Sequence, residues 1–305
     1  MLDVRRLRVL RAVAREGSLS GAARALDYTQ PAVSHHIARL EEEVGTSLLR
    51  RTPRGMAVTD AGAALVAHAD ALLARLAAAE DEVAAIAQLR AGRVRLAAFP
   101  SGAATLVPAA ARALRERHPQ IAVSLVEAEP PEAVALLREG EVDLALAFDY
   151  PEADAAPGGE LTVVELMAEE LLAVLGPDGP GRRGAGRARR IDLARLADET
   201  WIAGCERCRA HLLHLARQAG FEPEIAYATD DYVTVQGLVA AGLGVALLPE
   251  LALSAARRAD VTVVGLTPPA ARRIVAVLAA GPRHPPAVTA MLAAVQAAAA
   301  ARDRS

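Results

Sequence analysis

The chain has 305 residues, of which 53% are hydrophobic; this length suits two or three domains, and this composition argues against disorder. Its basic residues are all arginine, and acidic residues outnumber them, which gives a net charge of −3 and argues against a uniformly nucleic-acid-binding surface. No charge-free apolar run is long enough to span a membrane, and the N-terminal segment lacks the apolar stretch of a signal peptide. We therefore expect a cytoplasmic protein whose two cysteines form no structural disulfide.

The charge is unevenly distributed along the chain. Residues 1–62 carry ten arginines and seven acids, a net charge of +3, whereas the remainder carries 24 arginines and 30 acids, a net charge of −6. The N-terminal segment is therefore the part of the chain that suits an anionic polymer such as DNA.

The N-terminal segment predicts a helix-turn-helix. Apolar residues at helical spacing predict a first helix that ends at Gly17, and Ser18 is placed to cap a second helix at 19–26. Thr29 is placed to cap a third helix, in which Pro31 is tolerated because the first turn needs no amide donor there. Two short helices joined by a tight turn are typical of this motif.

The predicted third helix has one apolar face and one polar face. Its buried stripe is expected to contain Val33, Ile37, Leu40 and Val44. The residues expected to point away from that stripe and to read base edges in a major groove are Gln30, Pro31, Ser34, His35 and Arg39. An ordinary solvated face is the alternative. A metal site at the paired histidines is disfavoured, because adjacent side chains on a helix point about 100° apart.

The pattern between Leu7 and Gly62 resembles the winged helix-turn-helix of LysR-type transcriptional regulators. The matching residues are Val13, Gly17, Ser18, Ala22, Ala23, Leu26, Thr29, Gln30, Pro31, Ala32, Val33, Ser34, Ile37, Leu40, Glu41, Gly45, Leu48, Arg51, Thr59 and Gly62. Two departures are Leu10 and Leu49, where the family usually has phenylalanine. Both positions remain apolar, so we expect altered packing alone.

The resemblance implies DNA-contact roles for four residues of this chain: Gln30, Pro31, Ser34 and Arg51. Our addition from the geometry of the helix is His35 and Arg39. A wing is predicted at 50–58, where Arg51 and Arg54 are placed for phosphate contacts.

A long helix is predicted from Thr59 to Leu89, a stretch without proline. Apolar residues with alternating spacings of four and three form a coiled-coil seam at Leu65, Ala69, Leu72, Leu76, Ala79, Val83 and Ile86. Such a helix spans roughly 45 Å and needs a partner for its stripe. The resemblance implies that it dimerises the chain, and the alternative is that it packs on its own domain.

Beyond residue 92, short apolar runs alternate with helical stretches, as in α/β folds. Strands are predicted at Val94–Phe99, Ile121–Glu127, Val142–Phe148, Leu171–Leu175, Trp201–Ala203, Glu224–Ala228, Val245–Leu248 and Ile274–Leu278. The resemblance extends here more loosely, and it implies a two-lobed effector domain of the periplasmic-binding-protein type. The expected fold class is α/β with a winged helix-turn-helix domain (1–62), a linker helix (63–90) and an effector domain (91–305), in which lobe I is 91–163 with 267–305 and lobe II is 164–266.

Ligands of open α/β sheets bind at the carboxyl ends of strands. That rule predicts an effector site at Pro100, Ser101, Gly102, Glu127, Phe148, Gly204, Cys205 and Asp230. The acids favour a cationic or hydroxyl-rich effector, whereas the helix that begins near Ser101 favours an anion. The sequence leaves both options open, and no metal or cofactor is expected.

Two cysteines and two histidines follow one another at intervals of three, at Cys205, Cys208, His211 and His214. One hypothesis is a thiol- or metal-responsive sensor, because a helix N-terminus can lower a thiol pKa. On a continuous helix, however, the four side chains drift apart and cannot face one ion. We expect Cys205 to border the effector pocket and the histidines to lie on the surface.

No motif supports catalysis, since Ser101 lacks the glycine pattern of a nucleophile elbow and no phosphate-binding loop is present. The sequence predicts a LysR-type regulator whose partners are double-stranded promoter DNA, a small-molecule effector and further copies of the chain in a homodimer or homotetramer, with RNA polymerase as a further candidate and no membrane. The competing interpretation is a solute-binding module without a regulatory role.

Overall fold

The computed structural model describes residues 2–53, 55–87, 92–151, 161–177, 190–281 and 284–302. The chain forms two compact units. Unit 1 is Met1–Leu89 with Arg138–Glu141, and unit 2 is Arg90–Leu137 with Val142–Ser305.

Unit 1 begins with three helices, α1 (Val4–Glu16), α2 (Leu19–Ala25) and α3 (Gln30–Val44). The predicted caps are confirmed. Gly17 ends α1 with a left-handed φ of 62°, the Ser18 side chain accepts a hydrogen bond from the Gly21 amide at 3.0 Å, and the Thr29 side chain accepts one from the Ala32 amide at 3.4 Å. Local capping chemistry therefore places the two helices and the turn.

The core of unit 1 contains the predicted apolar stripe of α3. Val33, Ile37 and Leu40 are buried against residues of α1 and α2. The prediction for Val44 is wrong, because 39% of this residue is exposed. It occupies the last turn of α3, directly before the left-handed cap at Gly45, and the core ends before that turn.

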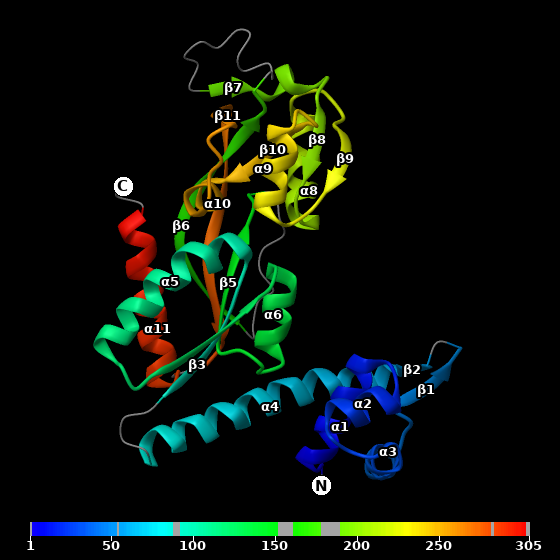
Figure 1. Cartoon of the computed structure of the whole chain (residues 1–305). Helices are drawn as coiled ribbons and strands as arrows, with labels where there is room; N and C mark the ends of the chain where they lie inside the picture. Colours follow the sequence, from blue (N-terminus) through cyan, green and yellow to red (C-terminus); the bar gives the residue numbers. More distant parts are fainter. Residues whose placement is uncertain are drawn as a thin grey trace. The chain divides into compact units, whose positions relative to one another are not determined.

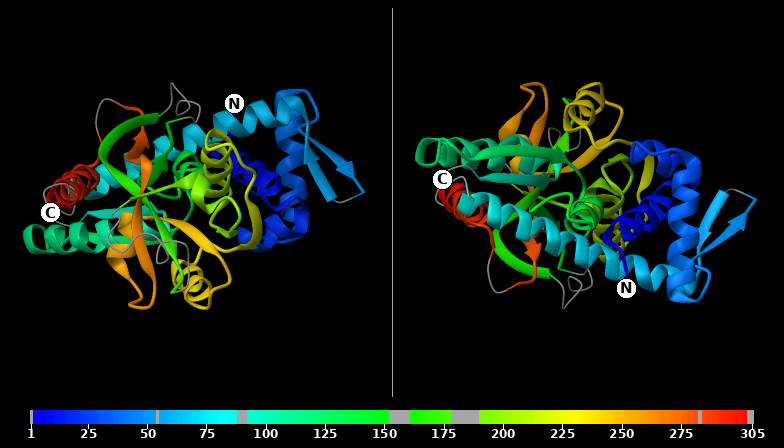
Figure 2. Two further views of the ribbon diagram at one scale, coloured as in Figure 1. Left: turned by 90° about the horizontal axis from the view of Figure 1, so that it is seen from above. Right: turned by 90° about the horizontal axis from the view of Figure 1, so that it is seen from below.

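A two-stranded wing follows α3. Strands β1 (Leu49–Thr52) and β2 (Gly55–Val58) pair antiparallel, and in both views of Figure 2 their hairpin extends away from the helices of unit 1. The Met56 amide donates to the Gly17 carbonyl oxygen at 2.7 Å, so β2 is joined to the end of α1. At Gly55, where φ is 131°, a Cβ atom would lie 2.5 Å from that same oxygen, and only glycine allows this approach.

The long helix α4 (Asp60–Ala87) is confirmed, and its apolar seam divides into two parts. Leu65 and Ala69 pack against the core of unit 1. Leu72 and Leu76, further along the same seam, are 55% and 37% exposed. The first part of the helix therefore covers its own domain, as in the alternative interpretation, and the second part leaves apolar side chains in contact with solvent.

Unit 2 is built on a mixed sheet, shown in Figure 1. Its main strand order among the described residues is β4-β3-β5-β11-β6-β10-β8-β9, with β7 paired to β11. The strands are β3 (Arg93–Ala98), β4 (Ala122–Glu127), β5 (Leu144–Asp149), β6 (Leu161–Leu175), β7 (Arg190–Asp192), β8 (Thr200–Ala203), β9 (Glu224–Ala228), β10 (Val245–Pro249) and β11 (Thr262–Ala279).

Two long strands, β6 and β11, run through the whole of unit 2. At one end they join β3, β4 and β5, which we call the first lobe, and at the other end they join β8, β9 and β10, which we call the second lobe. All eight predicted strands are present, but the prediction covers only one end of β6 and one end of β11. Glutamates interrupt the apolar residues in the rest of β6, and Pro268 and Pro269 interrupt them in the rest of β11, so the prediction stopped short there.

Helices cover both lobes of unit 2. They are α5 (Pro100–Arg117), α6 (Pro130–Arg138), α8 (Glu206–Gln218), α9 (Tyr232–Ala240), α10 (Glu250–Ala255) and α11 (Pro286–Arg302), with a 3₁₀ turn at Leu193–Leu196. Helices α5 and α11 lie side by side in the first lobe (Figure 1). Among the residues that the structure describes, no helix combines the length and apolarity that a membrane crossing requires.

Candidate functional site

The polar face of α3 is open to solvent. All five predicted base-reading residues of this helix are exposed: Gln30, Pro31, Ser34, His35 and Arg39. His36 is half-buried and stacks on Tyr28, with ring centroids 5.7 Å apart, so it faces the preceding turn. The face left open at the start of α3 is narrow and carries hydrogen-bonding groups, as a major groove requires.

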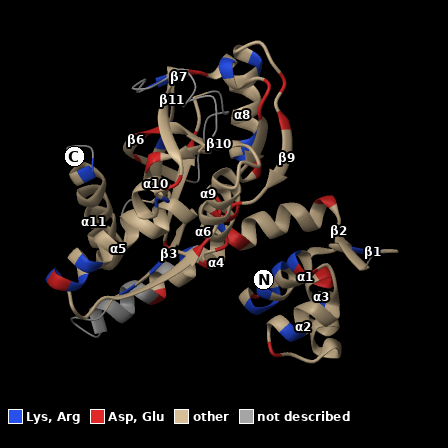
Figure 3. Ribbon diagram, turned by 45° about the horizontal axis from the view of Figure 1, so that its top comes forward, with Lys and Arg blue, Asp and Glu red and all other residues tan. Residues whose placement is uncertain are grey.

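The second half of α3 is acidic. Glu41, Glu42 and Glu43 follow one another there and show as a red segment in Figure 3. Arg39 donates a hydrogen bond to Glu42 at 2.6 Å, so its charge is already paired. Positive charge for phosphates must then come from elsewhere in unit 1. Arg51 is exposed on β1 and can supply it, whereas Arg54 lies outside the described residues.

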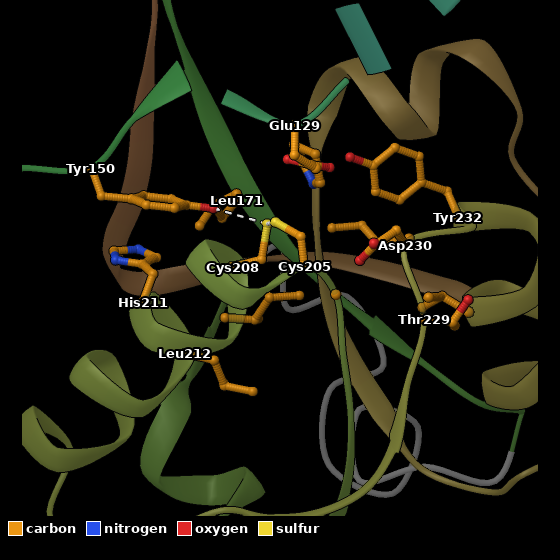
Figure 4. Close-up of a pocket in the computed structure, with 15 residues that line it drawn as sticks. Glu129, Tyr150, Leu171, Cys205, Cys208, His211, Leu212, Thr229, Asp230 and Tyr232 are labelled. Atoms are coloured by element: carbon orange, nitrogen blue, oxygen red, sulfur yellow. Dashed lines mark hydrogen bonds between the residues drawn. The ribbon is translucent and has the colours of Figure 1, made fainter. Parts of the chain in front are cut away.

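Unit 2 contains a pocket at the carboxyl ends of its strands, between the two lobes (Figure 4). Its lining consists of Glu129, Tyr150, Leu171, Gly204, Cys205, Cys208, His211, Leu212, Thr229, Asp230, Tyr232, Val235, Leu247, Leu248 and Pro249. The pocket leaves about 30 Å³ for the centre of a water-sized molecule. On that measure one bound water needs about 10–15 Å³, so the free space suits an occupant of only a few atoms.

The structure brings three predicted effector residues, Gly204, Cys205 and Asp230, to this pocket. The other five do not line it. Glu127 is exposed, Pro100 is half-buried, and Ser101, Gly102 and Phe148 are buried.

The reason for this burial is an arginine that the sequence did not single out. Arg272 of β11 donates from Nη2 to the Ser101 hydroxyl at 2.8 Å, and its guanidinium lies 4.2 Å from the centre of the Phe148 ring. Arg272 also donates from Nε to Glu169 of β6 at 2.7 Å, and both side chains are fully buried. Burial is the largest single influence and lowers the pKa of Arg272, but Glu169 together with the neighbouring Tyr232, Tyr150 and Cys208 raises it above its ordinary value.

Two sulfur atoms face each other in the wall of the pocket. Cys205 caps α8 and Cys208 lies in its first turn, which places the two Sγ atoms 3.0 Å apart. The Tyr150 hydroxyl of the first lobe lies 3.5 Å from the Cys208 sulfur (Figure 4). Glu129, likewise of the first lobe, lines the same pocket as Cys205. The Tyr150 hydroxyl thus joins the cysteines of the second lobe to the first lobe.

The hydrogen bond between the two cysteines shifts their pKa values in opposite directions. The hydrogen bond from Cys205 lowers the pKa of the Cys208 thiol, and the charge of Arg272 and the Tyr150 hydroxyl act in the same direction. The same hydrogen bond, with burial, raises the pKa of Cys205. Burial also raises the pKa of Glu129. These surroundings therefore favour the thiolate on Cys208 over the thiolate on Cys205.

The prediction that the histidines lie on the surface is wrong for His211. His211 is only 4% exposed, and its ring stacks on Tyr150 with centroids 3.9 Å apart and planes 9° apart. His214 is half-buried, with its Nε2 2.9 Å from the Gln218 side-chain nitrogen. The described residues contain no cluster of metal-ligating side chains, so these four residues do not form a preassembled metal site.

Among the polar and aromatic residues that line the pocket, sequence reasoning missed Tyr150, Tyr232 and His211. Tyr150 follows β5, Tyr232 begins α9, and His211 lies on the face of α8 that carries Cys208. Of these three residues, only Tyr150 could have been found from the rule that ligands bind at the ends of strands, because it lies two residues beyond Phe148.

Two family models match the chain. "Bacterial regulatory helix-turn-helix protein, lysR family" matches residues 4–63, and "LysR substrate binding domain" matches residues 87–300. Among relatives of the chain, a "Probable HTH-type transcriptional regulator LrrA" from Synechococcus elongatus is 32% identical over 255 residues, which cover 82% of each chain.

Solved structures share the whole fold. The crystal structure of CbnR, a LysR family transcriptional regulator, aligns with 98% of this chain and 99% of its own, with a TM-score of 0.63 at 22% identity. A structure of full-length CbnR with its target DNA aligns equally well, with a TM-score of 0.63 at 23% identity. The chain therefore belongs to the LysR family of DNA-binding transcriptional regulators, with an N-terminal helix-turn-helix domain and a C-terminal effector-binding domain.

Proposed function

We propose that the start of α3 reads promoter DNA in this protein. Gln30, Pro31, Ser34 and His35 would contact base edges, Arg39 would adjoin them once released from Glu42, and Arg51 and Arg54 would contact phosphates. The observation that carries this proposal is the division of α3 into a buried face and an open polar face at its N-terminal end. CbnR, a protein of the same fold, has been crystallised on its target DNA.

The effector would act between the two lobes of unit 2. The pocket there has walls from both lobes, so an occupant bound more tightly in one lobe arrangement shifts the population toward that arrangement. We expect the chain to work in the cytoplasm as a homodimer or homotetramer, with unit boundaries near residues 62 and 90. A change in lobe arrangement would alter the spacing of two recognition helices and hence promoter output.

A binding titration tests the DNA-reading function. Purified protein is titrated against the DNA directly upstream of its own gene and against a scrambled fragment, at one fixed near-physiological salt concentration, because phosphate contacts dominate raw affinity. We expect a preference of about a thousandfold or more for the upstream fragment. Equal binding to both fragments, with and without cell extract metabolites, would contradict the proposal for this promoter.

Single substitutions separate base contacts from phosphate contacts. Ser34→Ala and His35→Ala should each weaken binding to the upstream fragment by about 1–3 kcal/mol and leave binding to scrambled DNA unchanged. Arg51→Ala should weaken binding to the upstream fragment and binding to scrambled DNA equally. Arg112→Ala, at an exposed arginine of α5, is the matched control and should change neither. If Ser34→Ala lowered both affinities alike, Ser34 would not be a base reader.

A further inference from the structure

The charged side chains that line the pocket of unit 2 are acidic. Among the described residues of the lining, none is an arginine or a lysine, whereas Glu129 and Asp230 carry carboxyl groups. Figure 4 shows both residues around the same space as the ring of Tyr232. The sequence leaves open whether the effector is a cation or an anion, and this lining favours a cation.

The positive groups close to the pocket already have negative partners. The Arg272 guanidinium donates to Glu169 at 2.7 Å. The Arg207 guanidinium, on α8, donates to Asp149 at 3.0 Å. The start of α5 is closed to an anion as well, because Ser101 is buried and its hydroxyl accepts a hydrogen bond from Arg272 at 2.8 Å. The carboxyl groups are therefore the charges that a ligand in the pocket meets.

Glu129 presents an acceptor that lacks a donor. Its Oε2 atom is buried and, within the part of the chain that the structure describes, has no hydrogen-bond partner. Burial raises the pKa of this carboxyl group, and the charge of Asp230 acts in the same direction. The charge of Arg272 opposes this shift but does not cancel it. A ligand that brings both an N–H group and a positive charge would satisfy Oε2 and stabilise the carboxylate.

The rest of the lining limits the size and shape of such a ligand. The free space suits an occupant of only a few atoms. Tyr232 adds an aromatic ring beside the carboxyl groups (Figure 4), and aromatic rings attract ammonium groups. The apolar part of the lining can accept one or two carbon atoms, and it consists of Leu171, Leu212, Val235, Leu247, Leu248 and Pro249.

We infer that the pocket binds the ammonium group of a short primary amine, with Glu129 and Asp230 as its acceptors and the carbon atoms against the apolar lining. This inference names the class of the effector, and it rests on the proposed function in that the pocket is the effector site. Glu129 follows β4 of the first lobe, and Asp230 follows β9 of the second lobe. One ammonium group held by both carboxylates therefore joins the two lobes and favours the arrangement in which they are close.

Thermal unfolding of the full-length protein tests the charge of the ligand. The fluorescence of Trp201, the only tryptophan of the chain, is followed in methylammonium chloride, sodium formate or tetramethylammonium chloride, with sodium chloride added to hold the ionic strength constant. A ligand of the folded state raises the unfolding temperature as its concentration rises. We expect this rise with methylammonium. Formate has the opposite charge and tetramethylammonium has no N–H group, so neither should produce it.

Glu129→Gln and Asp230→Asn test the place of binding. In isothermal titration calorimetry each should weaken methylammonium binding by on the order of tenfold or more, because each removes a charge-assisted hydrogen bond. Glu132→Gln, at an exposed acid of α6, is the matched control and should bind like the wild type. Asp230 is exposed, so Asp230→Asn carries the test if Glu129→Gln does not fold.

Several results would overturn the inference. Stabilisation by formate would show that the pocket prefers an anion, and equal stabilisation by tetramethylammonium would show that no N–H group is recognised. Methylammonium binding that survives unchanged in Asp230→Asn and Glu129→Gln would place the amine elsewhere, and no binding of methylammonium to the wild type would exclude the class. None of these readouts uses DNA, so failure of the upstream-DNA titration would count against the proposed function alone.

Discussion

At the scale of single residues, Arg272 organises the interior of unit 2. Its guanidinium is bound to Glu169 and Ser101 and lies over the ring of Phe148, with no exposed surface. Glu169 in turn accepts a hydrogen bond from the Leu251 amide at 2.8 Å. Among the described residues, the Nη1 atom of Arg272 has no hydrogen-bond partner. The arginine is thus held by one carboxylate, whose loss would leave a buried charge uncompensated.

Glu169→Gln should therefore destabilise the protein strongly. Removing one partner of a buried ion pair costs about 3–5 kcal/mol in the free energy of unfolding. Urea denaturation at neutral pH measures this. Glu116→Gln, at an exposed ion pair on α5, is the control and should leave the midpoint unchanged. If Glu169→Gln lowered the free energy of unfolding no more than the control does, water would have to reach the Arg272–Glu169 pair.

The two cysteines should differ in their reaction with iodoacetamide as the pH changes. Because the pKa of Cys208 is lowered, its thiolate persists at pH values where an ordinary cysteine is protonated, and its reactivity falls only as the pH drops through that lowered pKa. Cys205, whose pKa is raised, should react later and at higher pH. Peptide mass spectrometry on timed samples measures both, and Cys205→Ser should move the Cys208 profile upward. Equal profiles for the two cysteines would contradict the assignment of the thiolate.

At the scale of elements, α4 serves two purposes along one apolar seam. Its first turns are buried on the core of unit 1 through Leu65 and Ala69, and its later turns expose Leu72 and Leu76. Exposed leucines at heptad spacing are stabilised when a second helix covers them. The sequence pattern is continuous, so it cannot show where the helix changes from an internal to an external partner.

Leu72→Glu/Leu76→Glu should weaken the association of chains without unfolding unit 1, because both side chains lie off its core. Sedimentation velocity over a concentration series measures the change, with circular dichroism to check helix content. Ala67→Glu places a charge on another exposed face of α4 and serves as the control. Unchanged assembly of the double variant would show that the chains associate through other surfaces.

At the scale of the whole molecule, the two units have separate hydrophobic cores. The core of unit 1 is built from residues before position 70, and the largest core of unit 2 from residues after position 93. Within unit 2, by contrast, β6 and β11 belong to both lobes and pair with each other along most of their length. The lobes are therefore expected to unfold together, and unit 2 is expected to unfold independently of unit 1.

A fragment of residues 92–302 should consequently fold by itself. We expect one cooperative thermal transition, at the temperature where the full chain loses the near-ultraviolet signal of Trp201, a residue buried in unit 2. Calorimetry and circular dichroism measure this. A fragment that remains unfolded would show that unit 2 needs contacts from the rest of the chain.

Most of the DNA-reading unit could be predicted from its amino-acid sequence. The caps at Ser18 and Thr29, the left-handed glycine at Gly17 and the helical period of α3 act over a few residues, so local chemistry was enough to place the helices and their open face. The eight strand positions in unit 2 followed from apolar runs for the same reason. The prediction that Val44 is buried was wrong, because the extent of a hydrophobic core depends on which other elements pack against the helix.

The full lining of the pocket depends on contacts between distant parts of the chain. Tyr150, Cys208 and Tyr232 come from segments far apart in the sequence, and nothing local to any of them indicates that they meet. Phe148 and Ser101 follow the end-of-strand rule but are buried beneath Arg272, which pairs with Glu169 across two strands. The pKa values of Cys205, Cys208 and Arg272 are set by such long-range neighbours. Desolvation and hydrogen bonding depend on distance in space rather than on distance in sequence.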